Sequence, residues 1–357
     1  MTDLLVRRDD LRETRIAETP RPNIEDGQAL LRVDRFGLTA NNVTYAVFGE
    51  AMSYWSFFPA EVGWGRVPVW GFADVEESLH PDVDVDGRVY GYLPPSSYVV
   101  VTPGDADARG FVDASAHRKP LPSAYQRYLL SDEDPFYSAA TEDLQMLLRP
   151  LFFTSFLLAD DLLDGGLDGA RTVVISSASS KTAIGTAFVL AEQGSGEVEV
   201  IGLTSARSID FVEGLDTYDR VVAYEDVGSI TAGSAAYVDI SGDGAIRRAV
   251  HAHFGEALRA SVAVGATAWE ELGAGEGERP GPTPRFFFAP DRVTKRSADW
   301  GRAGLEERVA GSWQPFVEWV ATWLEVESAD GFGAVQKTYL DLLENRVGPR
   351  VAHVFSV

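Results

Sequence analysis

The chain has 357 residues, of which 45% are hydrophobic and 24% are charged. This composition is typical of globular proteins and excludes wholesale disorder and fibrous classes. Because 31 Lys and Arg stand against 54 Asp and Glu, the formal net charge is −23. So acidic a surface repels phosphate backbones and anionic lipid, so we expect neither nucleic acid nor a membrane as a partner.

The chain contains no cysteine, which excludes disulfides, thiolate catalysis and zinc sites built from Cys. Its first residues carry charges throughout, unlike a signal peptide. The most apolar run, residues 151–158, is far shorter than the roughly 20 residues of a membrane-spanning helix. We therefore expect a soluble, cytoplasmic protein.

The first part of the chain reads as β-rich. Residues 29–36 and 87–92 alternate between apolar and polar side chains, Gly and Pro punctuate the region, and residues 98–101 are consecutive apolar or aromatic side chains. These patterns predict short strands of a barrel-like domain. Residues 135–163 then predict a helix, interrupted weakly at Pro150.

An alternation of strands and helices follows. Buried-strand patterns lie at residues 171–176, 197–203, 220–224, 235–240, 260–264 and 285–289, and helical patterns at 183–193, 209–214 and 245–254. This alternation predicts a doubly wound parallel sheet. Residues 273–284 are rich in Gly and Pro and predict a loop, and residues 303–325 predict an amphipathic helix whose aromatic side chains lie in the core.

The turn after the first of these strands is a candidate phosphate site. Residues 177–185 read SASSKTAIG and lead directly into a helix, whose amide groups and dipole favour an anion. Against the G-x-G-x-x-G fingerprint, the positions are held by Ser180, Thr182 and Gly185, with Lys181 between the first two. Lysine binds phosphate as a point charge, so a side chain can replace part of the usual backbone cradle.

The end of the second strand indicates which dinucleotide is bound. A site for NAD carries Asp or Glu here to bind the ribose 2′-hydroxyl, and none is present. Thr204, Ser205 and Arg207 stand in its place, and this set suits the 2′-phosphate of NADP. We expect NADP as the cofactor.

The order of these parts resembles the medium-chain dehydrogenase/reductase superfamily, in particular a divergent bacterial branch of its zinc-independent quinone and enoyl reductases. Residues 28–42 resemble that family's early strand and turn, residues 86–91 its G-D-R-V-x-G strand, residues 167–175 its entry to the nucleotide fold, and residues 344–353 its closing strand. The resemblance implies two domains of an α/β protein.

The first implied domain is a GroES-like, partly open β-barrel formed by residues 1–148 and completed by about residues 326–357. The second is a Rossmann NADP-binding domain formed by residues 149–325. The family often dimerises, so the resemblance also suggests a homodimer. Its zinc-binding members use Cys and His; because this chain has no Cys and its His251 and His253 are two residues apart, we expect no metal.

The resemblance implies candidates for the reaction itself. In similar enoyl reductases a Tyr after the early turn donates a hydrogen bond to the developing oxyanion; Tyr54 is nearest that position and Tyr45 is second. Asn42 is a further catalytic candidate, because its amide can bond a carbonyl. Thr154 lies where the family approaches the nicotinamide and is counted with the cofactor-binding residues.

Several other enzyme classes fail on their motifs. The chain has neither the Tyr-x-x-x-Lys of short-chain reductases nor the G-x-S-x-G of α/β-hydrolases, and Ile175 and Ser180 replace both glycines of a P-loop. We expect an NADP(H)-dependent oxidoreductase that reduces an apolar α,β-unsaturated or aromatic carbonyl compound. Two alternatives stay open on the same fold: a non-redox lyase acting on a ketone, and a non-catalytic NADP-binding sensor or scaffold.

Overall fold

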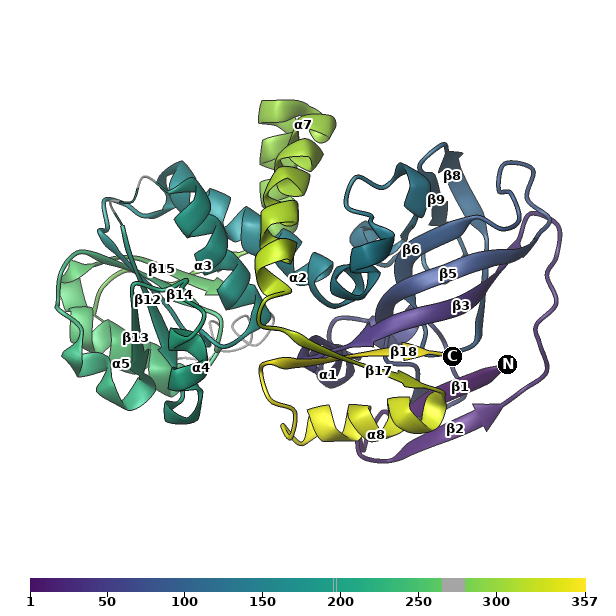
Figure 1. Ribbon diagram of the computed structural model, residues 1–357, viewed down its shortest axis with the longest axis horizontal. Helices are drawn as coiled ribbons and strands as arrows, with labels where there is room; N and C mark the ends of the chain where they lie inside the picture. Colours follow the sequence, from purple (N-terminus) through teal and green to yellow (C-terminus); the bar gives the residue numbers. More distant parts are fainter. Residues whose placement is uncertain (195, 197, 265–279) are drawn as a thin grey trace. The chain divides into compact units, whose positions relative to one another are not determined.

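The computed structural model describes residues 1–194, 196, 198–264 and 280–357 (Figure 1). The chain divides into two compact units. The split unit consists of Met1–Leu147 and Leu324–Val357, and the central unit of Leu148–Trp323. Most of the predicted loop at residues 273–284 lies outside the described residues. No helix in the described ranges is both long and apolar enough to cross a bilayer.

The split unit is built mainly from antiparallel strands. They are β1 (Thr2–Arg7), β2 (Thr14–Glu18), β3 (Ala29–Leu38), β4 (Trp64–Gly65), β5 (Val69–Ser78), β6 (Arg88–Leu93), β7 (Tyr98–Val101), β8 (Pro103–Asp107), β9 (Gly110–Asp113), β10 (Arg127–Leu130), β17 (Glu325–Asp330) and β18 (Val351–Ser356). The helices are α1 (Ala40–Val47) and α8 (Phe332–Leu343). Short 3-10 turns include Tyr54–Ser56 and Ser123–Tyr125.

The main sheet of the split unit runs in the order β17-β18-β3-β5-β6-β10-β9-β8, with β7 also paired to β3, and a smaller sheet runs β2-β1-β4. The C-terminal strand β18 pairs antiparallel with β3, placing Phe355 opposite Phe36. The predicted closing strand therefore does return to this sheet. β3 and β5 are buried at runs of consecutive residues, and the core of the split unit gathers residues far apart in sequence, including Phe36, Tyr92 and Phe355.

The central unit contains a parallel sheet. Its described strands are β11 (Thr172–Ile175), β12 (Glu199–Thr204), β13 (Arg220–Ala223), β14 (Ala235–Asp239), β15 (Leu258–Val264) and β16 (Arg285–Phe287), in the order β13-β12-β11-β14-β15-β16. Its helices are α2 (Glu142–Asp161), whose first residues belong to the first segment of the split unit, α3 (Lys181–Gln193), α4 (Ile209–Glu213), α5 (Gly244–Phe254) and α7 (Ala289–Val320).

Numbered from β11, the strand order is 3-2-1-4-5-6, which is the order of the Rossmann fold. The central strand β11 reads TVVI and is buried at every residue, because helices cover both faces of such a sheet. The predicted α/β fold, with a doubly wound parallel sheet beside a separate β domain, is confirmed. The chain reverses its direction of winding between β11 and β14, and ligands of this fold bind at that point.

Helix α7 differs from its predicted extent. It begins at Ala289 rather than near residue 303 and bends at Gly301, where φ is 76°. Its first turns are polar because Arg292 and Arg296 pair with the buried carboxylate of Asp160 on α2, Arg296 at 2.8 Å. Because charged rather than apolar side chains are buried here, the sequence shows no apolar stripe that would predict these turns. The aromatic side chains further along α7 lie in the core, as expected, and Phe316 stacks on Phe152 of α2.

Candidate functional site

The loop between β11 and α3 lies at the carboxyl edge of the central sheet and contains the predicted phosphate-binding residues. Helix α3 begins at Lys181, and the Ser180 side chain caps it by accepting a hydrogen bond from the Ala183 amide at 3.2 Å. The amides of the first turn and the positive end of the helix dipole therefore point out of the carboxyl edge of the sheet. Lys181 and Thr182 are the first two residues of this turn, as the sequence predicts.

The pKa of the Lys181 side chain is lowered. Its side chain is half-buried, and the loss of water around it lowers the pKa of Lys181 to about 8. The ammonium group is therefore still charged at neutral pH, but a bound anion would stabilise it further. This combination of a lysine and a helix N-terminus suits a phosphate group.

The structure shows the surroundings of two residues in and near the predicted fingerprint. The tight turn after β11 is made by Ser177, whose φ of 52° is the left-handed conformation that the first glycine normally adopts. Gly185 lies instead in the second turn of α3, where an added Cβ would be 2.7 Å from Ser155 Oγ of α2. Gly185 thus permits close packing between two helices rather than between a helix and a strand. The serine-rich sequence of the turn conceals both facts.

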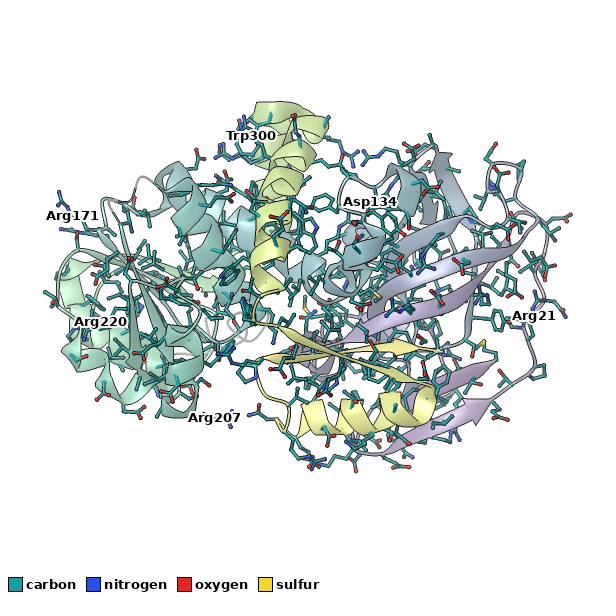
Figure 2. The ribbon with its side chains drawn as sticks, in the orientation of Figure 1. Arg21, Asp134, Arg171, Arg207, Arg220 and Trp300 are labelled. Carbon is teal, nitrogen blue, oxygen red and sulfur yellow. The ribbon has the colours of Figure 1, made fainter. Side chains whose placement is uncertain are left out.

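The end of β12 presents the second set of predicted residues. Thr204 is its last residue and is buried, whereas Arg207 is exposed in the 3-10 turn Ala206–Ser208. Figure 2 shows the Arg207 side chain at the surface. Ser205 lies between them, with its hydroxyl oxygen 3.3 Å from Ser208 Oγ. Ser205 and Arg207 are accessible to a ligand at the same edge of the sheet as the loop after β11, since the two strands are parallel neighbours.

The Thr154 hydroxyl forms a hydrogen bond within its own helix, α2. It donates to the carbonyl oxygen of Pro150, four residues earlier in the same helix, at 3.3 Å. Its neighbour Ser155 is the residue that reaches the predicted site, with Oγ 2.9 Å from the carbonyl oxygen of Thr182. Among the described contacts, therefore, α2 touches the start of α3 through Ser155 and not through Thr154.

A buried polar network lies at the point where the winding reverses. Ser176 follows β11, and its hydroxyl donates to Asp239 at the end of β14 (3.1 Å) while accepting from the amides of Ile240 and Ser241 (3.0 Å each). Asp239 also pairs with Arg247 of α5 at 2.7 Å, and both are fully buried. Breaking such a pair typically costs about 3–5 kcal/mol, so this network fixes the two loops that flank the crevice. A carboxylate directly after a buried strand is the sequence signal for it.

The split unit contains a cluster of aromatic hydroxyl groups. The rings of Tyr45 and Tyr54 lie 4.7 Å apart, the rings of Tyr92 and Tyr125 lie within 6.4 Å of Tyr45, and Trp70 packs on Tyr92. Trp70 Nε1 donates to the Tyr45 hydroxyl at 3.2 Å, and the hydroxyl oxygens of Tyr54 and Tyr125 lie 3.5 Å apart. The structure thus brings the two predicted proton donors together.

Burial keeps these hydroxyl groups protonated. It raises the pKa of Tyr45 and the pKa of Tyr54 above the usual value, although the contact with Tyr125 partly lowers the latter. Tyr54 is only half-buried, whereas Tyr45 is enclosed. A protonated, partly accessible phenol can donate a hydrogen bond, so Tyr54 remains the stronger candidate acid.

Asn42 has a different environment from the one expected of a catalytic amide. Its Oδ1 accepts from the Thr39 amide at 2.8 Å in the capping box that starts α1, and its Nδ2 donates to the Pro68 carbonyl at 2.8 Å. The side chain is buried. Both ends of the amide are thus engaged in holding α1 against the chain that leads into β5.

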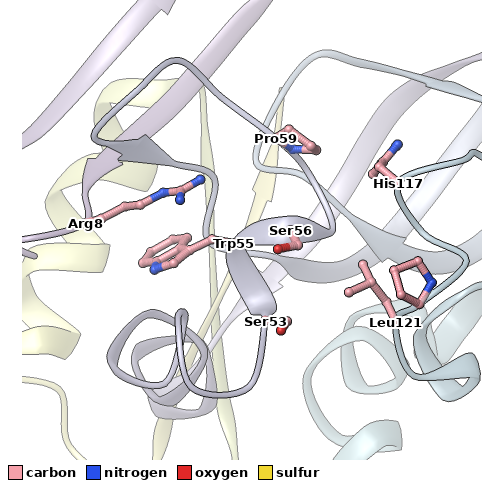
Figure 3. Close-up of a pocket in the computed structure, with 8 residues that line it drawn as sticks. Arg8, Ser53, Trp55, Ser56, Pro59, His117 and Leu121 are labelled. Atoms are coloured by element: carbon pink, nitrogen blue, oxygen red, sulfur yellow. The ribbon is translucent and has the colours of Figure 1, made fainter.

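A pocket of about 440 Å³ opens beside the turn that carries Tyr54. It is lined by Arg8, Ser53, Trp55, Ser56, Pro59, His117, Pro120 and Leu121. Figure 3 shows the Ser53–Ser56 turn on one side and His117 and Leu121 on the other. The neighbouring aromatic residues Phe57 and Phe58 are core residues instead. Polar and apolar side chains both line this pocket.

The histidines of α5 point to separate partners. His251 contacts the Ser261 hydroxyl and the Pro280 carbonyl, while His253 contacts the Ile230 carbonyl. Among the described residues no three His, Asp or Glu side chains gather as metal ligands would. These histidines serve packing in the central unit.

The family follows from comparison of the sequence with family models. The model described as "Protein of unknown function (DUF2855)" matches residues 36–348, which is most of the chain. The chain belongs to this family. No curated protein matches the DUF2855 chain.

Solved structures show which fold the DUF2855 chain has. CurA from Vibrio vulnificus is 14% identical with a TM-score of 0.63 and covers 100% of this chain and 99% of its own. The yhdH oxidoreductase from Salmonella enterica, solved in complex with NADP, is 14% identical with a TM-score of 0.55 and covers 100% of both chains. TarJ from S. aureus, in complex with NADPH, is 10% identical with a TM-score of 0.59. The resemblance to the zinc-independent medium-chain reductases is thus confirmed for the fold.

Proposed function

We propose that this DUF2855 chain is a zinc-independent, NADP(H)-dependent reductase of an α,β-unsaturated or aromatic carbonyl compound. The observation that carries the proposal is the carboxyl edge of the central sheet. There the N-terminus of α3 and Lys181 face one anion position, and Ser205 and the exposed Arg207 face another, in a chain of net charge −23. Two cationic positions at the ligand-binding edge of a Rossmann sheet fit the pyrophosphate and the 2′-phosphate of NADP.

The structural relatives support the same cofactor. CurA and TarJ have each been crystallised with NADPH, and the yhdH oxidoreductase with NADP. When bound, NADP(H) supplies or takes up the hydride. Lys181 and the first turn of α3 would hold the pyrophosphate, and Arg207 with Ser205 would select the 2′-phosphate.

Tyr54 is the proposed proton donor. Its phenol is protonated at neutral pH, as an ordinary tyrosine is, and burial raises the pKa of Tyr54 further. It would donate its hydroxyl proton to the substrate oxygen as negative charge develops there. The aromatic rings of Tyr45 and Tyr125 pack against the Tyr54 ring, and such surroundings suit a flat, apolar substrate. A cytoplasmic location and a homodimer remain predictions from the sequence.

A thermal-shift titration with NADPH and NADH in parallel tests the cofactor. A ligand at 100 times its dissociation constant adds about 2.7 kcal/mol of stability, which gives a readily measured shift. We expect NADPH to stabilise the protein and NADH to do so much less. No shift with either dinucleotide would contradict the proposal. A shift with NADPH but no turnover in a screen of enones, quinones and aromatic aldehydes would favour the sensor or the lyase.

A further inference from the structure

The turn that follows β11 holds an energetically unfavourable conformation. Ser177 has a φ of 52°, and a residue with a side chain pays about 1–2 kcal/mol to adopt the left-handed region. Glycine, which most proteins of this fold use at the tight turn, adopts it without that cost. Other contacts must therefore hold the turn in this chain.

Two tyrosine hydroxyls supply such contacts. The Tyr224 hydroxyl accepts a hydrogen bond from the Ser177 amide at 3.0 Å, and the Tyr218 hydroxyl donates to the Ala178 carbonyl at 3.0 Å. Tyr218 lies just before β13 and Tyr224 just after it. The short segment that contains β13 thus binds backbone groups of two consecutive residues of the turn, the amide of Ser177 and the carbonyl of Ala178.

The neighbouring strand β12 is shaped to allow this arrangement. The Ala178 amide donates to the Leu203 carbonyl at 3.0 Å, which draws the turn against the strand. A Cβ on Gly202 would lie 2.8 Å from Ala178 Cβ and 3.0 Å from the Tyr218 ring. Gly202 therefore provides the space in which the Tyr218 ring reaches under the turn. Burial also raises the pKa of Tyr218, so its hydroxyl remains a donor.

We propose that Tyr224, assisted by Tyr218, is a positioning residue that holds the serine-rich turn in the anion-binding conformation that glycines provide elsewhere. The inference rests on the proposed dinucleotide site at α3. Because Tyr224 takes up the Ser177 amide, this amide does not bind the ligand, and the phosphate is directed to the first turn of α3 and to Lys181.

Hydrogen exchange in the protein without ligand tests the positioning directly. In Y224F the Ser177 amide loses its acceptor, so its exchange should accelerate at least several-fold while amides in the middle of β11 exchange unchanged. The affinity for NADPH, measured by fluorescence titration, should fall roughly two- to twelvefold, the range expected for one hydrogen bond. The control Y98F, in the split unit, should change neither quantity.

A second substitution distinguishes positioning from direct ligand contact. Ser177→Gly removes the conformational cost at the turn, so Y224F combined with S177G should regain most of the NADPH affinity. If the double variant binds as weakly as Y224F alone, Tyr224 contacts the ligand itself and the inference is overturned. Should Y224F fail to fold, Y218F serves in its place. Hydrogen exchange of the Ala178 and Ser179 amides is then measured and should accelerate if the tyrosines hold the turn.

The two proposals fail in different ways. Unchanged exchange at Ser177 in Y224F overturns the positioning role even if NADPH binds normally. Absence of NADPH binding by the unaltered protein overturns the proposed function, while the exchange measurement still reports on the turn.

Discussion

Gly185 of α3 and Ser155 of α2 lie so close together that a Cβ on the glycine would be 2.7 Å from the serine Oγ and 2.9 Å from its Cβ. Ser155 Oγ is also 2.9 Å from the Thr182 carbonyl, so the serine fixes the start of α3 from the side. The two helices meet through a glycine because no larger residue fits. This contact determines where the N-terminus of α3 lies.

Gly185→Ala should therefore destabilise the protein by about 1–3 kcal/mol, the usual cost of overpacking. The control Gly311→Ala lies on α7, where a Cβ meets nothing within 4 Å. That change should be neutral or stabilise by roughly 0.5–1 kcal/mol, since alanine favours a helix over glycine. Chemical denaturation of both variants measures the difference. Equal stabilities for the two would contradict the close contact.

Lys181 predicts a pH dependence of cofactor binding. The phosphate stabilises the ammonium form, and burial lowers the pKa of Lys181 to about 8 in the free protein. The affinity for NADPH should therefore weaken as the pH rises from 7 through 8 and beyond, because the lysine loses its charge. Titrations at several pH values with the unaltered protein and with K181M check this. K181M should bind NADPH weakly at every pH, and its affinity should not decrease as the pH rises.

Lys181 also makes the stability of the free protein depend on pH. This stability should increase as the pH rises, whereas the affinity for NADPH should decrease. Its folded-state pKa lies below the value of 10.5 in the unfolded chain, so the charged form is disfavoured on folding. That cost is fully present below pH 8 and fades as the pH rises towards 10.5. K181M should accordingly raise the melting temperature of the free protein near pH 7, with the gain shrinking at high pH. A loss of stability near pH 7 would contradict a net cost of burying the charged lysine.

Arg207 predicts selectivity between dinucleotides. Arg207→Ala should weaken NADPH binding about tenfold or more, since a hydrogen bond to a charged group contributes about 1.5–3 kcal/mol, and should leave NADH binding unchanged. Arg171→Ala is a matched control, because Arg171 is also exposed but precedes β11 at the opposite edge of the sheet. Figure 2 marks both arginines. Equal losses for NADPH and NADH would remove Arg207 from the 2′-phosphate site.

Replacing Tyr54 should lower turnover without weakening the binding of NADPH. Tyr54→Phe should lower kcat roughly a hundredfold or more, as expected for a general acid, while the dissociation constant of NADPH stays the same. Because burial raises the pKa of Tyr54, the unaltered enzyme should show no alkaline decline from this group below about pH 10. Steady-state rates across the pH range test both statements. Tyr45→Phe serves as the comparison, and a larger loss there would move the acid role to Tyr45.

Asn42 predicts a structural rather than a chemical effect. Asn42→Ala removes the capping box of α1 and the bond to Pro68, so it should cost about 1–2 kcal/mol of stability. Asn41→Ala, one residue earlier and less buried, should cost less. Denaturation curves and turnover are measured on the same samples. A fall in turnover at unchanged stability would restore Asn42 as a catalytic residue.

Local patterns in the sequence account for much of the central unit. The run TVVI and the Ser-Ser-Lys-Thr segment after it predict a strand, a turn and a helix, and β11 and α3 confirm them. Apolar periodicity reports on burial by neighbours along the chain, and capping residues mark the start of a helix. The strand order follows from this alternation together with the resemblance.

Contacts between distant residues account for what the sequence does not reveal. Ser176 and Asp239 are 63 positions apart, and Ser177 and Tyr224 are 47 apart. Nothing in the sequence near Ser177 signals a left-handed residue, because serine rarely adopts that conformation. Likewise the start of α7 lacks an apolar stripe, since Arg292 and Arg296 bury themselves against Asp160. Such partners become visible only in three dimensions.

The position of β18 in the sheet of the split unit determines the order in which the chain can fold. β18 supplies a pairing partner of β3, so residues 1–147 cannot complete this sheet until β18 has left the ribosome. The central unit is one uninterrupted segment and meets no such delay. Domains usually fold in the order of their synthesis. Here the order is inverted: the segment made in the middle is finished first, and the segment made first is finished last.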